Sequence, residues 1–177
     1  LKKSQFFKKP KRGDIVSLEI EKLTFGGKGL ARLNGQYVVF VPYTAPGDVI
    51  EAKITNRKSK YGEARIESFQ SKADYRIEPV CPLFTKCGGC SWQHLDIEDQ
   101  LVWKRRIVEE SLHRVKTQQP EELIIEDVAA CPEPFYYRNK MEFTFGQEAP
   151  DQPVKIGFHM PGNWKHILDV EKCWLMP

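Results

Sequence analysis

The chain of 177 residues can bury one large core or two small ones, and its contents of 41% apolar and 29% charged residues are typical of a globular protein. No run approaches about 18 consecutive apolar residues, so the sequence predicts no transmembrane helix and no membrane partner. Residues 1–12 are basic but are not followed by a long apolar stretch, which excludes a secretory signal. We therefore expect a cytoplasmic protein with reduced cysteines.

Charge divides the chain into two parts. Residues 1–72 carry 15 Lys and Arg against 7 Asp and Glu, whereas residues 73–177 carry 12 against 17. A basic block followed by an acidic one suggests two domains with different tasks. The basic block is a candidate for binding a polyanion such as nucleic acid, although solvated surface lysines would give the same composition.

Residues 1–12 are predicted to be a disordered basic arm, and residues 13–72 to be short strands separated by turns. Asn34-Gly35 lies between two apolar runs and predicts a tight hairpin, because both turn positions require positive φ. Further strands are expected within 41–58 and 60–69. About five short strands without an intervening helix predict a small closed β barrel of the OB type, since an all-β unit of this size must close or expose its edges.

Residues 73–177 are predicted to form an α+β unit, in which antiparallel strands pack against one long helix. The helix is expected over 95–116, where acidic residues occupy the first turn. Its apolar stripe, with a helical period, consists of Leu101, Val108, Leu112 and Val115. Strands are predicted at 122–130, 137–146, 154–160 and 166–175.

Three of the five cysteines fall within ten residues, in the stretch CPLFTKCGGC from Cys81 to Cys90. The two glycines before Cys90 let the chain turn sharply and aim backbone N–H groups at thiolate sulfurs. Three thiolates do not complete a metal site. Cys173, at the end of a predicted strand, is favoured as the fourth ligand, and Cys131, in a predicted loop, is the alternative.

Two metal centres suit such a group of thiolates. Zinc usually shows two short C-x-x-C motifs, of which this chain has one. A [4Fe-4S] cluster accepts three ligands from one loop and a distant fourth. The spacing favours iron–sulfur, with a structural zinc site of four cysteines as the alternative and buried cysteines without metal as a third interpretation.

Several motifs, in the same order along the chain, resemble the iron–sulfur-containing uracil-C5 RNA methyltransferases. These are CPLFTKCGGCSWQHL, YRNKMEFTFG and IGFHMPGNWKHILDVEKC. The earlier stretches FGGKGLARLNGQYVVFVPYTAPGDVIEAKI and KYGEARI resemble the TRAM domain of the members that act on bacterial 23S ribosomal RNA. The resemblance implies a five-stranded, RNA-binding TRAM barrel at 13–72 and a central iron–sulfur domain at 73–177. It also implies that the [4Fe-4S] ligands are Cys81, Cys87, Cys90 and Cys173.

In that family a third domain binds S-adenosylmethionine and carries the cysteine nucleophile and the carboxylate base. No stretch of this chain resembles that domain, and no glycine-rich strand-to-helix turn is present. We therefore expect no catalytic residue and no S-adenosylmethionine site in this chain, and no methylation by this chain alone. Cys131 is expected to be a structural or solvent-facing thiol rather than a nucleophile, because neighbouring Glu133 is a poor activator of a thiol.

RNA contacts are expected from cationic side chains that bind phosphates and from aromatic rings that stack on bases, here Phe25 and Tyr61. Each could also be an ordinary surface charge or a core ring. The cationic candidates are Lys28, Arg32, Arg57, Lys58, Lys60, Arg65, Arg138 and Lys140.

Three functions are compatible with these patterns. The first is the RNA-recognition and cluster-binding part of an S-adenosylmethionine-dependent RNA methyltransferase. We expect it to act on ribosomal RNA rather than transfer RNA, as a monomer without an obligate protein partner. The second is a free-standing RNA-binding OB-type module with a structural zinc site. The third is an electron-transfer protein, which would leave the basic barrel unexplained.

Overall fold

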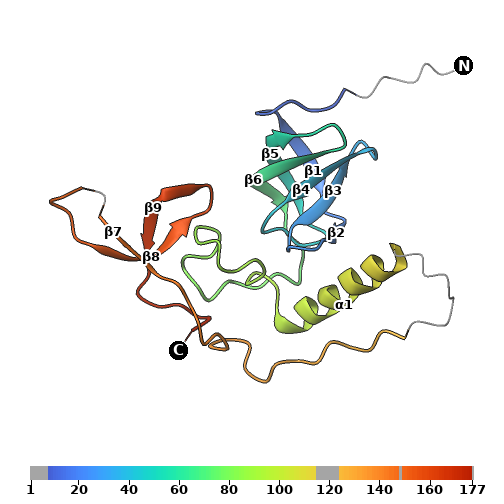
Figure 1. The fold of residues 1–177 in the computed structure, drawn as a ribbon. Helices are drawn as coiled ribbons and strands as arrows, with labels where there is room; N and C mark the ends of the chain where they lie inside the picture. The colour runs from blue at the N-terminus through green and yellow to red at the C-terminus, as the bar shows by residue number, and fades with distance from the viewer. Residues whose placement is uncertain (1–7, 115–123, 148, 177) are drawn as a thin grey trace, which may run out of the picture. The chain divides into compact units, whose positions relative to one another are not determined.

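The computed structural model describes residues 8–114, 124–147 and 149–176, with the backbone alone at Arg114 and Trp164. Residues 1–7 of the predicted arm, Val115 of the predicted helix and the first two residues of the strand predicted at 122–130 lie outside the described residues. The chain divides into two compact units (Figure 1). The first contains the described residues up to Arg76 and the helix from Arg106 onward. The second contains Ile77–Arg105 and the described residues from 124 onward.

The first unit is built on a six-stranded sheet with the order β1-β5-β6-β4-β3-β2. Its strands are β1 (Ile15–Glu19), β2 (Lys22–Leu23), β3 (Gly29–Leu33), β4 (Tyr37–Val41), β5 (Val49–Arg57) and β6 (Tyr61–Ser71) (Figure 1). β1 and β2 are two parts of one extended segment, and β1 pairs with β5 whereas β2 pairs with β3. This change of partner closes the sheet on itself, which is consistent with the predicted OB-like barrel.

The turn between β3 and β4 has the predicted conformation. Asn34 has a φ of 50° and Gly35 a φ of 69°, so both positions lie in the left-handed region that Asn and Gly tolerate best. The two strands continue in antiparallel register from Leu33 opposite Tyr37. The Asn-Gly hairpin signal in the sequence is thereby confirmed.

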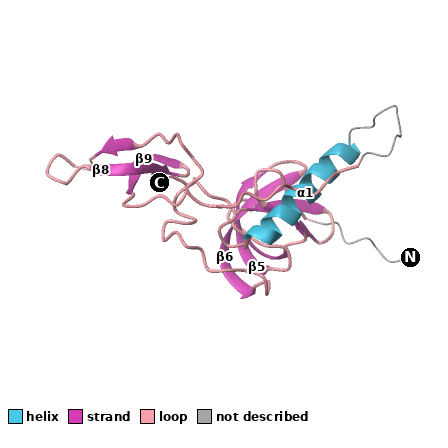
Figure 2. Cartoon of the chain, turned by 90° about the horizontal axis from the view of Figure 1, so that it is seen from below, coloured by secondary structure: helices cyan, strands magenta, loops and turns pink. Residues whose placement is uncertain are grey.

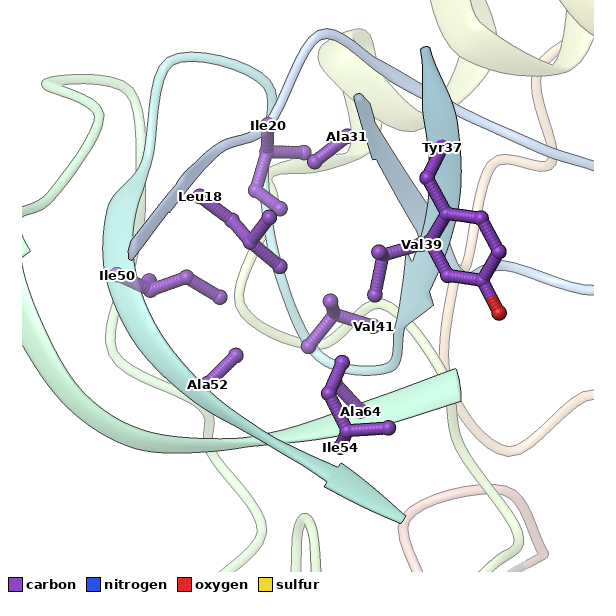
Figure 3. Close-up of a cluster of buried hydrophobic side chains, with 10 residues drawn as sticks. All are labelled: Leu18, Ile20, Ala31, Tyr37, Val39, Val41, Ile50, Ala52, Ile54 and Ala64. Atoms are coloured by element: carbon purple, nitrogen blue, oxygen red, sulfur yellow. The ribbon is translucent and has the colours of Figure 1, made fainter. Parts of the chain in front are cut away.

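The interior of the barrel is filled by alternate residues of its strands. Along β4, Tyr37, Val39 and Val41 are buried, whereas the residues between them are partly exposed. The period of two follows from the pleat, which sends successive side chains to opposite faces. In Figure 3 the hydroxyl of Tyr37 points away from the other nine labelled side chains of this core.

The second unit contains a three-stranded antiparallel sheet in the order β7-β8-β9. Its strands are β7 (Thr144–Gly146), β8 (Lys155–Met160) and β9 (Asn163–Asp169). The helix α1 (Ile97–Arg114) runs from this unit into the first. Asp96 caps the start of α1, because its Oδ1 accepts the N–H of Asp99 over 2.9 Å. Figure 2 shows the chain between β6 and α1 as loop.

Two predictions of secondary structure are corrected. The residues at 124–130, 137–143 and 170–175 form no strand, so Cys173 lies beyond the end of β9 rather than at the end of a strand. An alternating pattern yields a strand only where a neighbouring strand pairs with it. The apolar stripe predicted to be the buried face of the helix is wrong in part. Val108 and Leu112 are 46% and 40% exposed, whereas Trp103 is buried. Within the described residues, no helix has the length and apolar character needed to cross a bilayer.

Candidate metal centre and RNA-contact residues

The segment from Cys81 to Cys90 folds as a series of tight turns. The N–H of Phe84 donates to the carbonyl of Cys81 over 3.0 Å, and the N–H of Cys87 donates to the carbonyl of Leu83 over 2.8 Å. Thr85, between these turns, has a φ of 72°, in a region that few residues other than glycine adopt. The loop is therefore held by its own backbone rather than by a helix or strand.

Cys173 reaches the same place from the far end of the chain. Two backbone hydrogen bonds position its segment, from the N–H of Tyr136 to the carbonyl of Trp174 and from the N–H of Arg138 to the carbonyl of Leu175, each over 2.9 Å. One pocket of about 520 Å³ is lined by residues that include Cys81, Cys87, Cys90 and Cys173. The structure thus brings together the four cysteines that the sequence singles out.

Cys131 lies apart from this group. Its side chain is exposed, it does not line the pocket of the four cysteines, and its Sγ donates to the carbonyl of Glu133 over 3.2 Å. No base is placed against its sulfur by any described hydrogen bond. Its exposure corresponds to the solvent-facing alternative rather than to a buried structural thiol.

Two N–H groups point at the clustered sulfurs. The backbone N–H of Gly89 donates to Sγ of Cys87 over 3.4 Å, and Nε2 of Gln93 donates to Sγ of Cys90 over 3.2 Å. Such bonds stabilise negative charge on sulfur. The sequence interpretation missed Gln93, although an amide side chain three residues after Cys90 is a signal that could have found it.

The environment of the thiols disfavours bare thiolates. Burial raises the pKa of Cys87 and of Cys90, and the charges of Cys81 and Cys173 raise both further. The N–H donors from Gly89 and Gln93 oppose this shift. Four thiolates in one pocket therefore need positive charge to become stable, which a metal centre would supply as it displaces the protons.

The donors do not converge on one point. Among the described residues, no group of three or more His, Cys, Asp or Glu side chains is arranged to hold a metal ion. Tetrahedral zinc requires all four sulfurs at about 2.3 Å from one ion. A [4Fe-4S] cluster binds each thiolate through a different iron, so its ligands surround a body. Cys81, Cys87, Cys90 and Cys173 are the residues of this pocket that could hold a metal centre of either kind.

Three cations, Arg138, Lys140 and Lys172, line the same pocket together with the carboxylate of Glu142, and they are called its cationic border below. Nζ of Lys172 lies 4.0 Å from the ring centroid of Trp174 and 5.7 Å from that of Tyr136. These cation–π contacts hold the ammonium group beside the segment that carries Cys173. Lys172 was also missed in the sequence, where its position directly before Cys173 was the signal that could have found it.

The predicted RNA-binding cations fall into two groups. Some form ion pairs: Lys28 with Glu63 (2.6 Å), Arg65 with Glu67 (3.0 Å), Lys140 with Glu142 (3.4 Å), and Arg32 with Glu21. Others are exposed and form no ion pair with a described residue, namely Arg57, Lys58, Lys60 and Arg138. The predicted stacking residues Phe25 and Tyr61 are 91% and 39% exposed.

Comparison with known proteins places a known domain within the first unit. Residues 9–66 match the family model of the TRAM domain. A protein of Bacteroides thetaiotaomicron named an uncharacterized RNA methyltransferase is 38% identical over 84% of this chain, and one of Listeria innocua with the same description is 40% identical over 92%. The aligned regions are 35% and 34% of those proteins, so the chain spans about a third of their length.

A solved structure shares the fold. The tRNA (uracil-54, C5)-methyltransferase of Pyrococcus abyssi, in complex with S-adenosyl-L-homocysteine, matches 89% of this chain and 32% of its own, with a TM-score of 0.55 and 23% identity. The chain thus contains a TRAM domain and is related, over nearly its whole length, to part of the RNA methyltransferases.

Proposed function

We propose that this chain is the RNA-recognition and [4Fe-4S]-binding part of an S-adenosylmethionine-dependent RNA uracil-C5 methyltransferase. The observation that carries the proposal is one pocket lined by four cysteines in a chain that also contains a TRAM domain. The names of the relatives support RNA methylation. The fold shared with the Pyrococcus abyssi enzyme supports uracil C5 as the methylated atom.

In this proposal the cluster ligands are Cys81, Cys87, Cys90 and Cys173. A bound cluster would supply the positive charge that four crowded thiolates need, and would join the loop at 81–90 to the segment at 173. The N–H groups of Gly89 and Gln93 stabilise charge on two of the sulfurs. The chain's own residues thereby build a rigid support, and methyl transfer belongs to a domain outside this chain.

RNA would be bound by the TRAM barrel at 13–72 and by the cationic border of the cysteine pocket in the domain at 73–177. The proposed contacts are Lys28, Arg32, Arg57, Lys60, Arg65, Arg138 and Lys140. Phosphate contacts of this kind position RNA without reading its sequence. We propose ribosomal RNA as the substrate, in the cytoplasm, with the protein acting as a monomer.

Metal analysis of the protein purified without oxygen tests the cluster. We expect a brown protein with a broad absorption band at about 400 nm and with iron and inorganic sulfide in equal amounts. One zinc ion per chain and no sulfide would refute the cluster and support a free-standing RNA-binding module with a zinc site.

The RNA substrate needs a separate test with the protein extended to the length of its relatives. Transfer of a labelled methyl group to ribosomal RNA, with the label recovered as 5-methyluridine, is the expected result. Label in transfer RNA alone would contradict the proposed substrate and leave the uracil-C5 reaction standing. Label at any other atom would contradict the reaction itself.

A further inference from the structure

The turn that joins β5 to β6 gathers positive charge at one tip of the barrel. Arg57, Lys58 and Lys60 are all exposed there. Nζ of Lys9 adds a fourth charge, because it donates to the carbonyl of Ser59 over 2.6 Å. Residues 57–61 are called the β5–β6 tip below.

The charges at the β5–β6 tip are not neutralised by ion pairs. In the described part of the chain, no carboxylate forms an ion pair with Arg57, Lys58 or Lys60. The charge of Lys58 lowers the pKa of Glu63 in small part. The Glu63 carboxylate itself, however, forms its ion pair with Lys28. The tip is therefore a concentration of charge available to an anion.

Hydrogen bonds from the Tyr37 hydroxyl and within the turn also fix the backbone conformation of the β5–β6 tip. The Tyr37 hydroxyl lies 2.9 Å from the carbonyl oxygen of Lys58 and 2.5 Å from that of Tyr61, and it can donate to either. The N–H of Lys58 closes the turn by donating to the carbonyl of Tyr61 over 2.8 Å. A Cβ on Gly62 would lie 3.1 Å from Cε1 of Tyr37, so the missing side chain lets the ring reach this position.

Other cations of the same barrel are placed differently. Lys28, Arg32 and Arg65 each have a carboxylate partner. A phosphate that binds one of these must displace or tolerate that carboxylate, whereas a phosphate at the tip meets no such cost. Ion pairing thus separates cations that looked equivalent in the sequence.

We propose that, among the phosphate contacts of the barrel, the β5–β6 tip contributes most of the binding to RNA phosphates, with the 39% exposed ring of Tyr61 beside it for an unpaired base. This inference rests on the proposed function, namely that the chain binds RNA. Because Tyr37 fixes the tip before RNA arrives, little conformational entropy is lost on binding. Single-stranded RNA is the favoured partner, since stacking on Tyr61 requires a base free of its own stack.

The test compares two double variants of the whole chain that remove the same charge. Arg57→Gln with Lys60→Gln removes two tip cations, and Arg32→Gln with Arg65→Gln removes two paired ones. Affinity for a labelled oligouridine of about 12 nucleotides is measured by anisotropy across a series of salt concentrations. For a single strand, the slope of log K against log salt decreases in magnitude by about 0.7 for each phosphate that the protein no longer neutralises.

We expect the tip variant to lower the magnitude of the slope by about 1.4 and the paired variant to change it by much less. Equal changes in both variants, or a larger change in the paired one, would overturn the proposal. Wild-type protein without salt-dependent RNA binding would instead refute the RNA-binding part of the proposed function.

A third variant, Tyr37→Phe, tests the support beneath the tip while keeping every charge. We expect RNA affinity to fall about threefold with an unchanged salt slope. Val41→Ala, a buried change elsewhere on β4, serves as the control for a loss of stability alone. It should leave RNA affinity at the wild-type level. A decrease of affinity in Val41→Ala equal to that in Tyr37→Phe would remove the special role of the hydroxyl.

Discussion

Gln93 and Cys90 are joined by a side-chain hydrogen bond, in which Nε2 of the amide donates to Sγ over 3.2 Å. At the other end of the same amide, Oε1 accepts the backbone N–H of Cys81 over 3.1 Å. One side chain therefore links the first cysteine of the loop to the last. It fixes the width of the loop and places a donor on a sulfur at the same time.

Replacing Gln93 with Glu should weaken metal retention. The new carboxylate can still accept the N–H of Cys81, but it offers no proton to Cys90 and adds negative charge beside the thiolates. We expect iron to be lost to a chelator about tenfold faster than from the wild type, as followed by bleaching of the cluster absorption. Gln152→Glu, a change at an exposed residue, is the control with the same change in charge, and identical rates in the two variants would contradict the role of Gln93.

Under the proposed function, Cys173 and Cys131 should differ in their effect on the metal content of the protein. Cys173→Ser should lose most of the bound iron, because Cys173 lines the pocket together with the loop cysteines. Cys131→Ser should keep the wild-type content, since Cys131 is exposed and outside that pocket. Iron and sulfide determination after anaerobic purification gives the answer. Full iron content in Cys173→Ser, or depletion in Cys131→Ser, would reverse the assignment of the fourth ligand.

Asp48→Asn should destabilise the barrel strongly. Asp48 is fully buried, and its carboxylate accepts hydrogen bonds from Arg76 (2.6 Å) and from the N–H groups of Ala45 (2.6 Å) and Ala73 (3.0 Å). The substitution leaves the Arg76 guanidinium, which is largely buried, without its counter-charge. We expect the free energy of unfolding, measured in urea, to fall by about 3 kcal/mol.

The matched comparison is Arg65→Gln, which removes the exposed pair with Glu67. Its cost should stay below about 1 kcal/mol, because water screens the two charges. A similar decrease of stability in both variants would mean that burial does not set the strength of these pairs.

Glu63 should make stability depend on pH in the acid range. Hydrogen bonds from Lys28, and then from Asn56, lower the pKa of Glu63 below its ordinary value, against the opposing effect of burial. Its folded pKa lies below the unfolded one, so the stabilisation is present above the unfolded pKa of about 4.3 and is lost as pH falls through the folded pKa. Glu63→Gln should therefore show a flatter decline of the urea midpoint below about pH 5 than the wild type.

Lys28→Met is the reciprocal variant, since it removes the largest cause of the shift. It should flatten the same part of the profile. A profile in either variant that falls as steeply as the wild type would show that this pair contributes nothing to the acid sensitivity.

The barrel could be predicted from the sequence because its signals are local. Alternation along β4 and the Asn34-Gly35 turn each depend on neighbouring residues. The segment at 137–143 shows alternation as well, yet among the described residues its backbone hydrogen bond to the C-terminal segment comes from Arg138, with a second from Tyr136 just before it. Whether residues 137–143 form a strand depends on pairing with a distant segment, and no local sequence pattern indicates that pairing.

The candidate sites show the same limit. The three loop cysteines could be selected because thiols are rare and their spacing is informative, whereas Cys173 was only favoured over Cys131 until the family resemblance implied it. The ion pairing of the cations could not be predicted, since Lys28 meets Glu63 and Arg32 meets Glu21 only once the strands are arranged in the folded sheet. Gln93 was hidden for a different reason: glutamine is common on surfaces, and its two hydrogen bonds appear only once the loop is folded.

The pocket of the four cysteines takes its walls from the loop at 81–90 and from the segment at 173. A growing polypeptide emerges from the ribosome with its N-terminal part first. The barrel can therefore finish folding on the nascent chain before the proposed cluster ligands are complete, because Cys173 emerges after the three loop cysteines. Under the proposed function, a chain terminated before residue 173 would hold three of the four proposed ligands and should retain little iron.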